Sequence, residues 1–572
     1  MAWYDEAVFY HIYPLGLTGA PKRNDYGEPA HRLPTLLPWV SHLRKLGVTA
    51  LYIGPLFESV GHGYETTDYR KVDARLGTND DLAQFVSACH DAGIRVVLDG
   101  VFNHVGRDFF AFRDLQQKRE GSPYRDWFCD VNFWGDNEYG DGFSYANWGG
   151  HNLLVKLNQR NPAVRDYLCD VMRFWVEAFD IDGIRLDAAD VLDFDFMKAL
   201  RRVANEVKDD FWLMGEVIHG EYSRWVNADM LHSVTDYALH KALYSGHNDH
   251  NYFEIAHTVR RTRSMLPAEA RLYNFVDNHD VERIVTKLAD KAHYLPVHVL
   301  LYALPGIPSV YYGSEFGIEG RKEWGSDDSL RPAIDLREHA GDYQSNPCTR
   351  LIAVLGAIYA NYRELAWGDY RELHLTTGQF AFARGSVVVA VNNEAFDVEF
   401  RVAVPDGEYV GLLGGQRGRA EGGCLEVHLG PDGGEVFAPV DERYECYRES
   451  CGGEASVLEA VIPANRGGAA EGVAATQAAR ANEQTGEWVR GEAAPANAPD
   501  APANVPAVSA AAVPIATVAP IPDVPYEQMN VEQLQAVILA KMEANGHVTD
   551  RMRRDVMENI WHDSLVNWAN SF

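Results

Sequence analysis

Strand-like and helix-like segments alternate along residues 8–315 of this chain. The first two apolar runs lie at 8–14 and 47–59, and the segment between them, 35–47, has apolar residues at helical spacing and ends in glycine. Such alternation predicts a parallel sheet with helical crossovers. Eight units of this kind predict an α/β fold, the (β/α)8 TIM barrel, in which functional side chains lie at the C-terminal ends of the strands.

The other six strands are expected in chain order. A helix is expected over 79–93 with Asn79 as its N-cap, and another opens at Asn161-Pro162 and runs to about Phe179. The six remaining strand segments are IRVVLDGVF (94–102), IDGIRLD (181–187), FWLMGEV (211–217), MLHSVTDYAL (230–239), RLYNFVDN (271–278) and SVYYGSE (309–315).

Several stretches depart from the alternation. One between strands three and four is too long for an ordinary loop, and another near the C-terminus has short alternating runs with Gly-rich turns, which predict an antiparallel β domain. An Ala- and Pro-rich stretch then predicts a disordered linker, and Asn530 with Gln533 forms a candidate capping box that opens a helical hairpin. The predicted division is barrel 1–104 and 161–367, insertion 105–160, β domain 368–445, linker 452–525 and helical hairpin tail 526–572.

Composition excludes several classes of partner. The chain has 572 residues, more than one core supports, and a formal net charge of −30, which disfavours nucleic acid and anionic membranes. It contains no apolar run of about 18 residues that could span a bilayer. The first strand begins without a leader-like segment before it, and seven cysteines lack CxxC spacing, so a cytoplasmic protein with reduced thiols is expected.

Four strand ends contain the residues with chemical potential. One carboxylic acid to protonate a leaving oxygen and one carboxylate to meet an anomeric carbon are what glycosidic bond cleavage needs. The segments are DGVFNH (99–104), GIRLDAAD (183–190), LMGEV (213–217) and FVDNHD (275–280), which supply Asp187, Glu216 and Asp280 with Arg185, His104 and His279.

These segments, in this order, resemble the alpha-amylase family, glycoside hydrolase family 13. The opening VFYHIYP, the run GVTALYIGPLFES, the loop HGYETTDY (62–69) and the strand VYYGSE (310–315) also resemble that family, so the likeness covers about residues 1–445. LVKLN (154–158) and His219 are similar to the neopullulanase, cyclomaltodextrinase and maltodextrin-hydrolase subgroup. The resemblance implies an inserted domain B after strand three and a C-terminal domain C.

The resemblance implies a role for each acid. Asp187 is implied as the nucleophile, and because Arg185 stands two residues earlier on the same face of the strand, we expect Arg185 to lower the pKa of Asp187 and keep it ionised. Glu216 is implied as general acid and base, and its apolar neighbours suit an acid that must hold a proton. Asp280 is implied to hold ring hydroxyls of the sugar.

The same resemblance implies the sugar-binding residues. Tyr64 would be the flat platform under the glucose, His104 and His279 would donate hydrogen bonds to it, and structural packing is the alternative for each. A grip on the next sugar is implied for Asp327 and Arg331, with solvated loop charges as the alternative. Stacking or packing are equally open for Trp134, Trp148 and Trp324.

A structural calcium in many family members uses an Asn at the position of Asn103 and a His four residues after the nucleophile. Here that second position is Val191, and no DxDxDG loop replaces it. We therefore expect no cofactor and no metal ligand, and a structural calcium remains the alternative.

Together these observations predict a retaining glycosidase that cleaves α-1,4-glucosidic bonds in maltooligosaccharides or cyclodextrins through a covalent glycosyl-Asp intermediate. An α-glucan transglycosylase and an oligo-1,6-glucosidase are the alternatives, and a catalytically inactive binding subunit is a remote one because all three carboxylates are present. The expected partner is an oligosaccharide, with self-association or partner docking open for the C-terminal helical tail.

Overall fold

The computed structural model describes residues 2–323, 326–450, 534–535 and 537–538. The chain divides into two units, Met1–Gly486 and Glu487–Phe572. The predicted linker 452–525 lies outside the described residues. So does the predicted hairpin 526–572, except for four residues, 534–535 and 537–538, which are helical.

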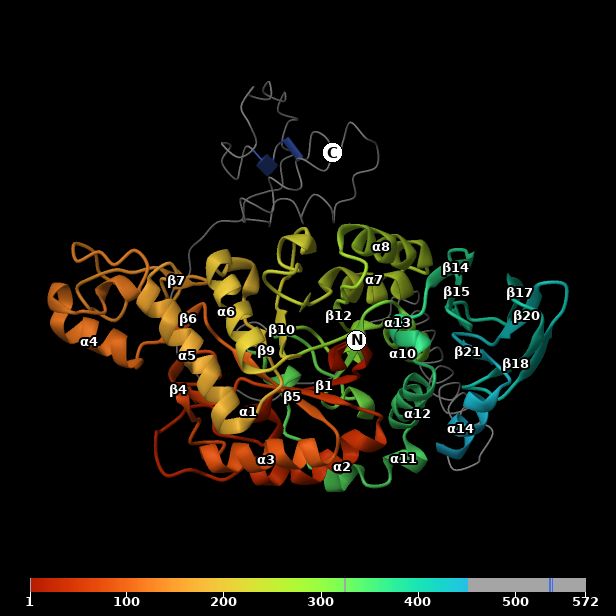
Figure 1. Cartoon of the computed structure of the whole chain (residues 1–572), viewed down its shortest axis with the longest axis horizontal. Coiled ribbons are helices and arrows are strands. Elements are labelled where there is room, and N and C mark those ends of the chain that lie inside the picture. The colour runs from red at the N-terminus through yellow and green to blue at the C-terminus, as the bar shows by residue number, and fades with distance from the viewer. Residues whose placement is uncertain (1, 324–325, 451–533, 536, 539–572) are drawn as a thin grey trace, which may run out of the picture. The chain divides into compact units, whose positions relative to one another are not determined.

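Eight parallel strands form one sheet in the order β11-β10-β9-β5-β2-β1-β13-β12. A parallel bridge between Thr235 and Tyr273 links the two edge strands, so the sheet is nearly closed and the predicted barrel is confirmed (Figure 1). The strands are β1 Phe9–Ile12, β2 Ala50–Ile53, β5 Arg95–Gly100, β9 Gly183–Leu186, β10 Trp212–Gly215, β11 Ser233–Val234, β12 Tyr273–Phe275 and β13 Ile307–Tyr311.

Helices follow the strands and cover the outside of the barrel (Figure 1). Their buried faces are apolar, as the 3.6-residue spacing predicts. The longer ones are α2 Leu37–Lys45, α3 Asn79–Asp91, α5 Pro162–Phe179, α6 Phe194–Val207, α7 Tyr237–Asn248, α8 Tyr252–Met265, α10 Tyr294–Ala303 and α12 Pro347–Asn361. The short ones are α1 Pro14–Leu17, α9 Ile284–Lys287, α11 Asp342–Ser345 and α13 Glu364–Trp367.

Two predicted helix starts had different outcomes. Asn161 caps α5 as predicted, because its side chain accepts a hydrogen bond from the Ala163 amide. The prediction for α3 was wrong by one residue. Thr78 is the N-cap and forms a capping box with Asp81, whereas the Asn79 side chain accepts from the Val72 amide at 2.9 Å.

The barrel interior changes character along its axis. Near the N-terminal ends of the strands the rings of Phe9, Trp212 and Tyr273 pack together, with Phe9 4.8 Å from Trp212 and 5.4 Å from Tyr273 between centroids. Further along β5 and β9 the inward face contains charged groups, and Asp99 of β5 is in register with Arg185 of β9. The barrel interior is therefore apolar near the N-terminal ends of the strands, and it contains charged side chains near their C-terminal ends.

Two smaller β structures flank the barrel (Figure 1). After β5 come the antiparallel strands β6 His104–Gly106, β7 Asn147–Trp148 and β8 His151–Lys156, with α4 Phe110–Lys118. The hairpin β3 Phe57–Ser59 and β4 Thr66–Val72 holds Tyr64 in its turn.

An antiparallel β region follows the barrel, as predicted. Six strands have the order β14-β15-β16-β21-β18-β19, and β17 pairs with β20. The bounds are β14 Tyr370–Leu375, β15 Gln379–Arg384, β16 Val387–Asn392, β17 Val398–Ala403, β18 Gly407–Gly411, β19 Arg417–Ala420, β20 Cys424–Leu429 and β21 Gly434–Pro439, followed by α14 Glu442–Ser450.

Candidate active site

A cavity of about 560 Å³ lies at the C-terminal ends of the barrel strands. Two of the nine predicted site residues, Arg185 and His279, are buried behind its wall. The other seven line it: Tyr64, His104, Asp187, Glu216, Asp280, Asp327 and Arg331. The structure thus brings the three predicted acids to one cavity.

Arg185 is the centre of the charged cluster. Its Nη1 donates to Asp187 Oδ1 at 2.9 Å and to Asp99 Oδ1 at 2.9 Å, while Nη2 pairs with Glu216 Oε2 at 2.8 Å. Asp187 and Glu216 therefore lie on the two amino nitrogens of one guanidinium, which keeps their carboxylates close. Retaining glycosidases need their two carboxyl groups about 5–5.5 Å apart.

The expected pKa of Asp187 needs correction. Burial raises the pKa of Asp187 well above its usual range, and the attraction of Arg185 opposes this shift without overcoming it. The negative charges of Glu216 and Asp99 add to the rise. The prediction from the neighbouring arginine was wrong because it left out burial, and because that single cation is shared among three carboxylates.

Glu216 is held by neighbours from two strand ends, those of β9 and β11. Besides Arg185, its Oε2 accepts from the Ala188 amide at 3.2 Å, and Tyr237 donates its hydroxyl to Oε1 at 3.3 Å. Asn278 in turn donates to the Tyr237 hydroxyl at 3.2 Å. The carboxyl group is thus fixed at the cavity wall with its side chain only 12% exposed.

Asp280 has the opposite electrostatic environment. His279 Nε2 lies 2.9 Å from its Oδ2, and Arg331 Nη2 donates to Oδ1 at 2.8 Å. Burial works against ionisation, but contact with His279 and Arg331 outweighs it, so the pKa of Asp280 lies well below its usual range. Asp280 therefore stays a carboxylate and can accept hydrogen bonds from sugar hydroxyls.

The aromatic and imidazole groups form one wall of the cavity. Tyr64 lies nearly parallel to His279 at 12° with centroids 5.6 Å apart, and its hydroxyl contacts His279 Nε2. His104 stacks on Trp148 at 8°, and its Nε2 has no hydrogen-bond partner among the described residues. Burial lowers the pKa of His104 to about 3, so the neutral imidazole is available to a ligand.

Asp327 and Arg331, which were predicted to hold the next sugar, form hydrogen bonds and ion pairs within the protein. Arg331 donates to Asp327 at 3.1 Å as well as to Asp280, and its Nε donates to the His279 carbonyl at 2.9 Å. Lys322 Nζ lies 3.7 Å from Asp327. Arg331 thus holds Asp280 in place, and Asp327 retains an oxygen at the cavity edge.

The three tryptophans that were candidates for stacking on a sugar have different positions in the structure. Trp148 lines the cavity, whereas Trp134 is 98% exposed and does not line it. Trp324 lies outside the described residues. Stacking on a sugar remains a prediction for Trp148.

Sequence reasoning missed two site residues. Asp99 is buried and accepts from Arg185, from Tyr52 at 2.8 Å and from Tyr64 at 3.3 Å. An acid at the end of the apolar strand RVVLDG was the available signal. Tyr237 lay inside the predicted strand 230–239, but β11 ends at Val234 and Tyr237 is the first residue of α7.

Asp99 also depends on a close approach of two strands. At Gly54, which follows β2, an added Cβ would collide with the Cβ of Asp99 and its backbone. Only a residue without a side chain leaves room for Asp99 to reach Arg185.

The residues at the expected calcium position do not fit a metal ion. Asn103 is buried with an unpartnered Oδ1, yet the side chain of Val191 offers no ligand atom. Within 2–323 and 326–450, the His, Cys, Asp and Glu side chains close enough to share an ion are Glu399, Glu426 and His428, all exposed on the β region. A single amide oxygen is too few for calcium, which takes about six to eight oxygens.

Comparison with known proteins agrees with this geometry. A family model described as the alpha-amylase catalytic domain matches residues 37–350. The chain belongs to the alpha-amylase family. The predicted family, and with it the class of glycosidases, is thereby confirmed.

The similar proteins include cyclomaltodextrinases and a neopullulanase. A cyclomaltodextrinase from a Bacillus species is 32% identical over 365 residues, 60% of this chain and 64% of that protein, so this chain spans under two thirds of its length. Neopullulanase 2 from Thermoactinomyces vulgaris is 31% identical over 471 residues, 76% of this chain and 78% of that protein. A solved cyclomaltodextrinase structure aligns with a TM-score of 0.68 and 26% identity over 76% of this chain and 78% of its own.

Proposed function

We propose that the chain is a retaining glycosidase that hydrolyses α-1,4-glucosidic bonds in maltooligosaccharides and cyclodextrins. The observation that supports this most directly is the sharing of one Arg185 guanidinium by Asp187 and Glu216 at the wall of the cavity. The names of the relatives, cyclomaltodextrinase and neopullulanase, support the substrate class.

In the first step an oxygen of Asp187 attacks C1 of the glucose, and the bond from C1 to the leaving oxygen breaks. Glu216 gives its proton to that oxygen, so the leaving sugar departs with a hydroxyl. The product is a glycosyl ester on Asp187. The Asp187 and Glu216 pair must hold one proton beforehand, on Glu216. Because the pKa of Asp187 is raised, Asp187 competes with Glu216 for this proton. The positive charge that develops at C1 favours the ionised form of Asp187.

In the second step a water molecule attacks C1, and its proton passes to the Glu216 carboxylate. The ester bond to Asp187 breaks, so the sugar leaves with its original anomeric configuration and both acids return to their starting state. Arg185 contacts both acids before the reaction, and it can keep its hydrogen bond to the ester carbonyl oxygen of Asp187, so it helps to preserve their spacing.

Asp280 and His104 act on the sugar rather than on the bond. The ionised Asp280 accepts hydrogen bonds from ring hydroxyls, and His104 offers its free Nε2. Hydrogen bonds of this kind that strengthen as the ring distorts lower the barrier.

Two measurements test the chemistry. NMR of the first product formed from maltoheptaose should show the α-anomer, and a β-anomer would refute retention. In a Glu216→Gln variant given maltosyl fluoride, whose fluoride leaves without a proton, the intact mass should rise by one maltosyl unit located on the Asp187 peptide. A variant that also contains Asp187→Asn is the matched control and should gain no mass.

A substrate panel tests the bond preference. Rates on maltoheptaose, β-cyclodextrin, pullulan and isomaltose should favour the first two. Dominant release from isomaltose would favour an oligo-1,6-glucosidase, and accumulation of longer products would favour a transglycosylase. If no substrate of the panel is turned over, the catalytically inactive binding subunit is the alternative that remains.

We also propose the cytoplasm as the compartment. Each of the six described cysteines is a free thiol, including buried Cys89 and Cys169, which suits a reducing environment. None of the helices in the described part of the chain is long and apolar enough to cross a bilayer. Self-association or docking through residues 526–572 remains a proposal, and the mass in solution with and without these residues tests it.

A further inference from the structure

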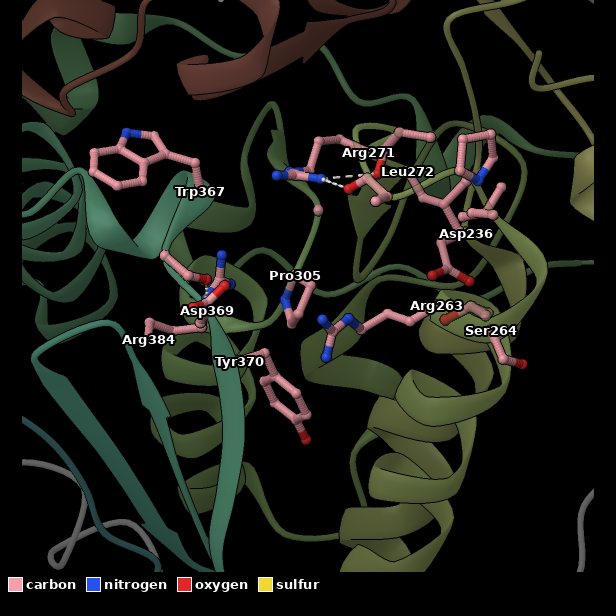
Figure 2. Close-up of a pocket in the computed structure, with 17 residues that line it drawn as sticks. Asp236, Arg263, Ser264, Arg271, Leu272, Pro305, Trp367, Asp369, Tyr370 and Arg384 are labelled. Atoms are coloured by element: carbon pink, nitrogen blue, oxygen red, sulfur yellow. Dashed lines mark hydrogen bonds between the residues drawn. The ribbon is translucent and has the colours of Figure 1, made fainter. Parts of the chain in front are cut away.

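A second cavity, of about 440 Å³, lies at the opposite end of the barrel from the active site. It is bounded by α8, by the segments that precede β12 and β13, and by the chain from α13 to β15 (Figure 2). Because the barrel strands are parallel, the segments before β12 and β13 mark the N-terminal end. Three arginines, Arg263, Arg271 and Arg384, line this cavity.

The three guanidinium groups come from different elements and extend toward the same central space. Figure 2 shows Arg263 extending from α8, Arg271 from the segment before β12 and Arg384 from β15. Within the described residues none of the three forms an ion pair. By contrast, Arg185 and Arg331 at the active site are both paired with acids.

Their hydrogen bonds leave many donors unused. Arg384 is buried and donates to the carbonyls of Gly368, Ala303 and Ala366, and Arg271 uses only Nη1, on two nearby carbonyls. Arg263 lies over the Tyr370 ring at 5.0 Å and makes no hydrogen bond with another described residue. Each guanidinium has five N–H donors, so Arg263 and Arg271 together keep most of theirs for a ligand.

The positive charges are close enough to affect one another. Burial lowers the pKa of Arg384 to about 10, and the charges of Arg271 and Arg263 contribute to the lowering. Two acids also line the cavity. Burial raises the pKa of Asp236 to about 7, its Oδ1 accepts from the Leu239 amide at 2.9 Å, and Asp369 is exposed without an ion pair in the described chain. The cavity therefore retains an excess of positive charge.

A neighbouring cavity extends this surface. It has a volume of about 370 Å³, shares Arg271, Pro267 and Ala270 with the first, and is lined by Arg201. Arg201 donates to the Met230 carbonyl at 2.8 Å, and its Nε has no partner among the described residues. Asp5 and Glu269 also line this second cavity, so the excess of positive charge is confined to the first.

We propose that this cavity binds a small phosphate-bearing molecule. Arg263 and Arg271 would hold the phosphate oxygens, Arg384 would add positive charge behind them, and the aromatic rings of Trp367 and Tyr370 would contact the neutral part. A planar guanidinium fork matches two oxygens of a phosphate, and the volume suits a ligand of sugar-phosphate size. The phosphate could be inorganic or belong to a phosphorylated sugar. The proposal does not depend on the glycosidase chemistry.

Titration calorimetry of the full chain with inorganic phosphate, glucose 6-phosphate and glucose, at constant ionic strength, tests this. We expect both phosphate compounds to bind and to compete. Arg263→Gln should weaken binding of each by at least about tenfold, the effect of one lost charged hydrogen bond. The matched control is Arg202→Gln, which removes an exposed, unpaired arginine on α6 and should change nothing.

Comparing the titrations with inorganic phosphate and with glucose 6-phosphate also identifies the source of the phosphate. Equal affinities would assign the site to free phosphate, and tighter binding of glucose 6-phosphate would assign it to a phosphorylated sugar. The proposal is overturned if neither compound binds, or if Arg263→Gln and Arg202→Gln bind alike. Because Arg263 is exposed and does not line the active-site cavity, its variant should keep the melting temperature and the turnover of the wild type.

Discussion

The two ends of the barrel use arginine in opposite ways. At the C-terminal end a single Arg185 is shared by Asp99, Asp187 and Glu216, so negative charge is in excess. At the N-terminal end Arg263 and Arg271 face a cavity, and neither is paired with an acid of the described chain.

The excess of charge at each end of the barrel favours a different kind of ligand. Excess negative charge around a sugar stabilises the positive charge that develops at C1 when a glycosidic bond breaks, and it also forces one carboxyl to keep a proton. Excess positive charge instead favours an anion. Local charge excess, rather than the net charge of −30, thus indicates what each end of the barrel can bind.

The largest effect is expected at the acidic end. Asp187→Asn should lower kcat by about 10⁴-fold or more, because it removes the nucleophile while the fold remains. The matched control is Asp190→Asn, a carboxylate that lines the same cavity without an ion pair to Arg185 in the described structure. Steady-state rates on maltoheptaose measure both. Equal losses would mean that cavity charge, and not the nucleophile, determines the rate.

At the basic end the largest effect is on stability. Arg384→Met should destabilise the fold by about 3 kcal/mol, because three backbone carbonyls lose their buried donor. Arg263→Met should cost less than about 0.5 kcal/mol, since its guanidinium is exposed. Denaturant unfolding of both variants measures the difference. A similar cost for the two would show that Arg384 and Arg263 are equivalent, contrary to the structure.

A smaller effect on rate is expected from the hydroxyl beside Glu216. Tyr237→Phe should lower kcat about tenfold with little change in KM, because it removes one hydrogen bond from the acid but leaves the sugar contacts. Tyr244→Phe on the same helix is the control, as Tyr244 does not line the cavity. A change in KM alone would place Tyr237 in sugar binding instead.

The smallest effect is a pH-dependent shift in melting temperature. Because the folded state raises the pKa of Asp187 above its unfolded value of about 3.9, the folded protein holds this proton more tightly. The stability that this contributes is present at low pH and is lost as pH rises above about 4. Asp187→Asn cannot ionise, so its melting temperature should match the wild type near pH 4 and exceed it by a few degrees at pH 7. A difference that does not vary with pH would contradict the raised pKa.

The barrel could be predicted because its signals are local. Alternating apolar segments define each strand, and the C-terminal ends of parallel strands meet at one edge, so Asp187, Glu216 and Asp280 were expected to converge. Features that depend on cross-strand register could not be predicted. The pKa of Asp187 depends on its burial and on how many acids reach Arg185, which includes Asp99 through the pairing of β5 with β9.

The arginine cavity gave no signal in the sequence. Arg263, Arg271 and Arg384 belong to a helix, a loop and a strand of the β region, and no spacing rule connects them. The capping of α3 shows the same limit at short range. Thr78 and Asn79 are both good caps, and the hydrogen bond from Val72 to Asn79 decides between them.

Gly54 makes the whole acidic cluster dependent on an atom that is missing. If the residue at position 54 had even a methyl group, Asp99 would be displaced, Arg185 would lose an anchor, and the spacing of the two reacting acids would drift. In a library randomised at this position and selected for sugar release, glycine should return almost alone. An engineer who wishes to alter specificity should therefore begin at the cavity rim and leave this hidden contact unchanged.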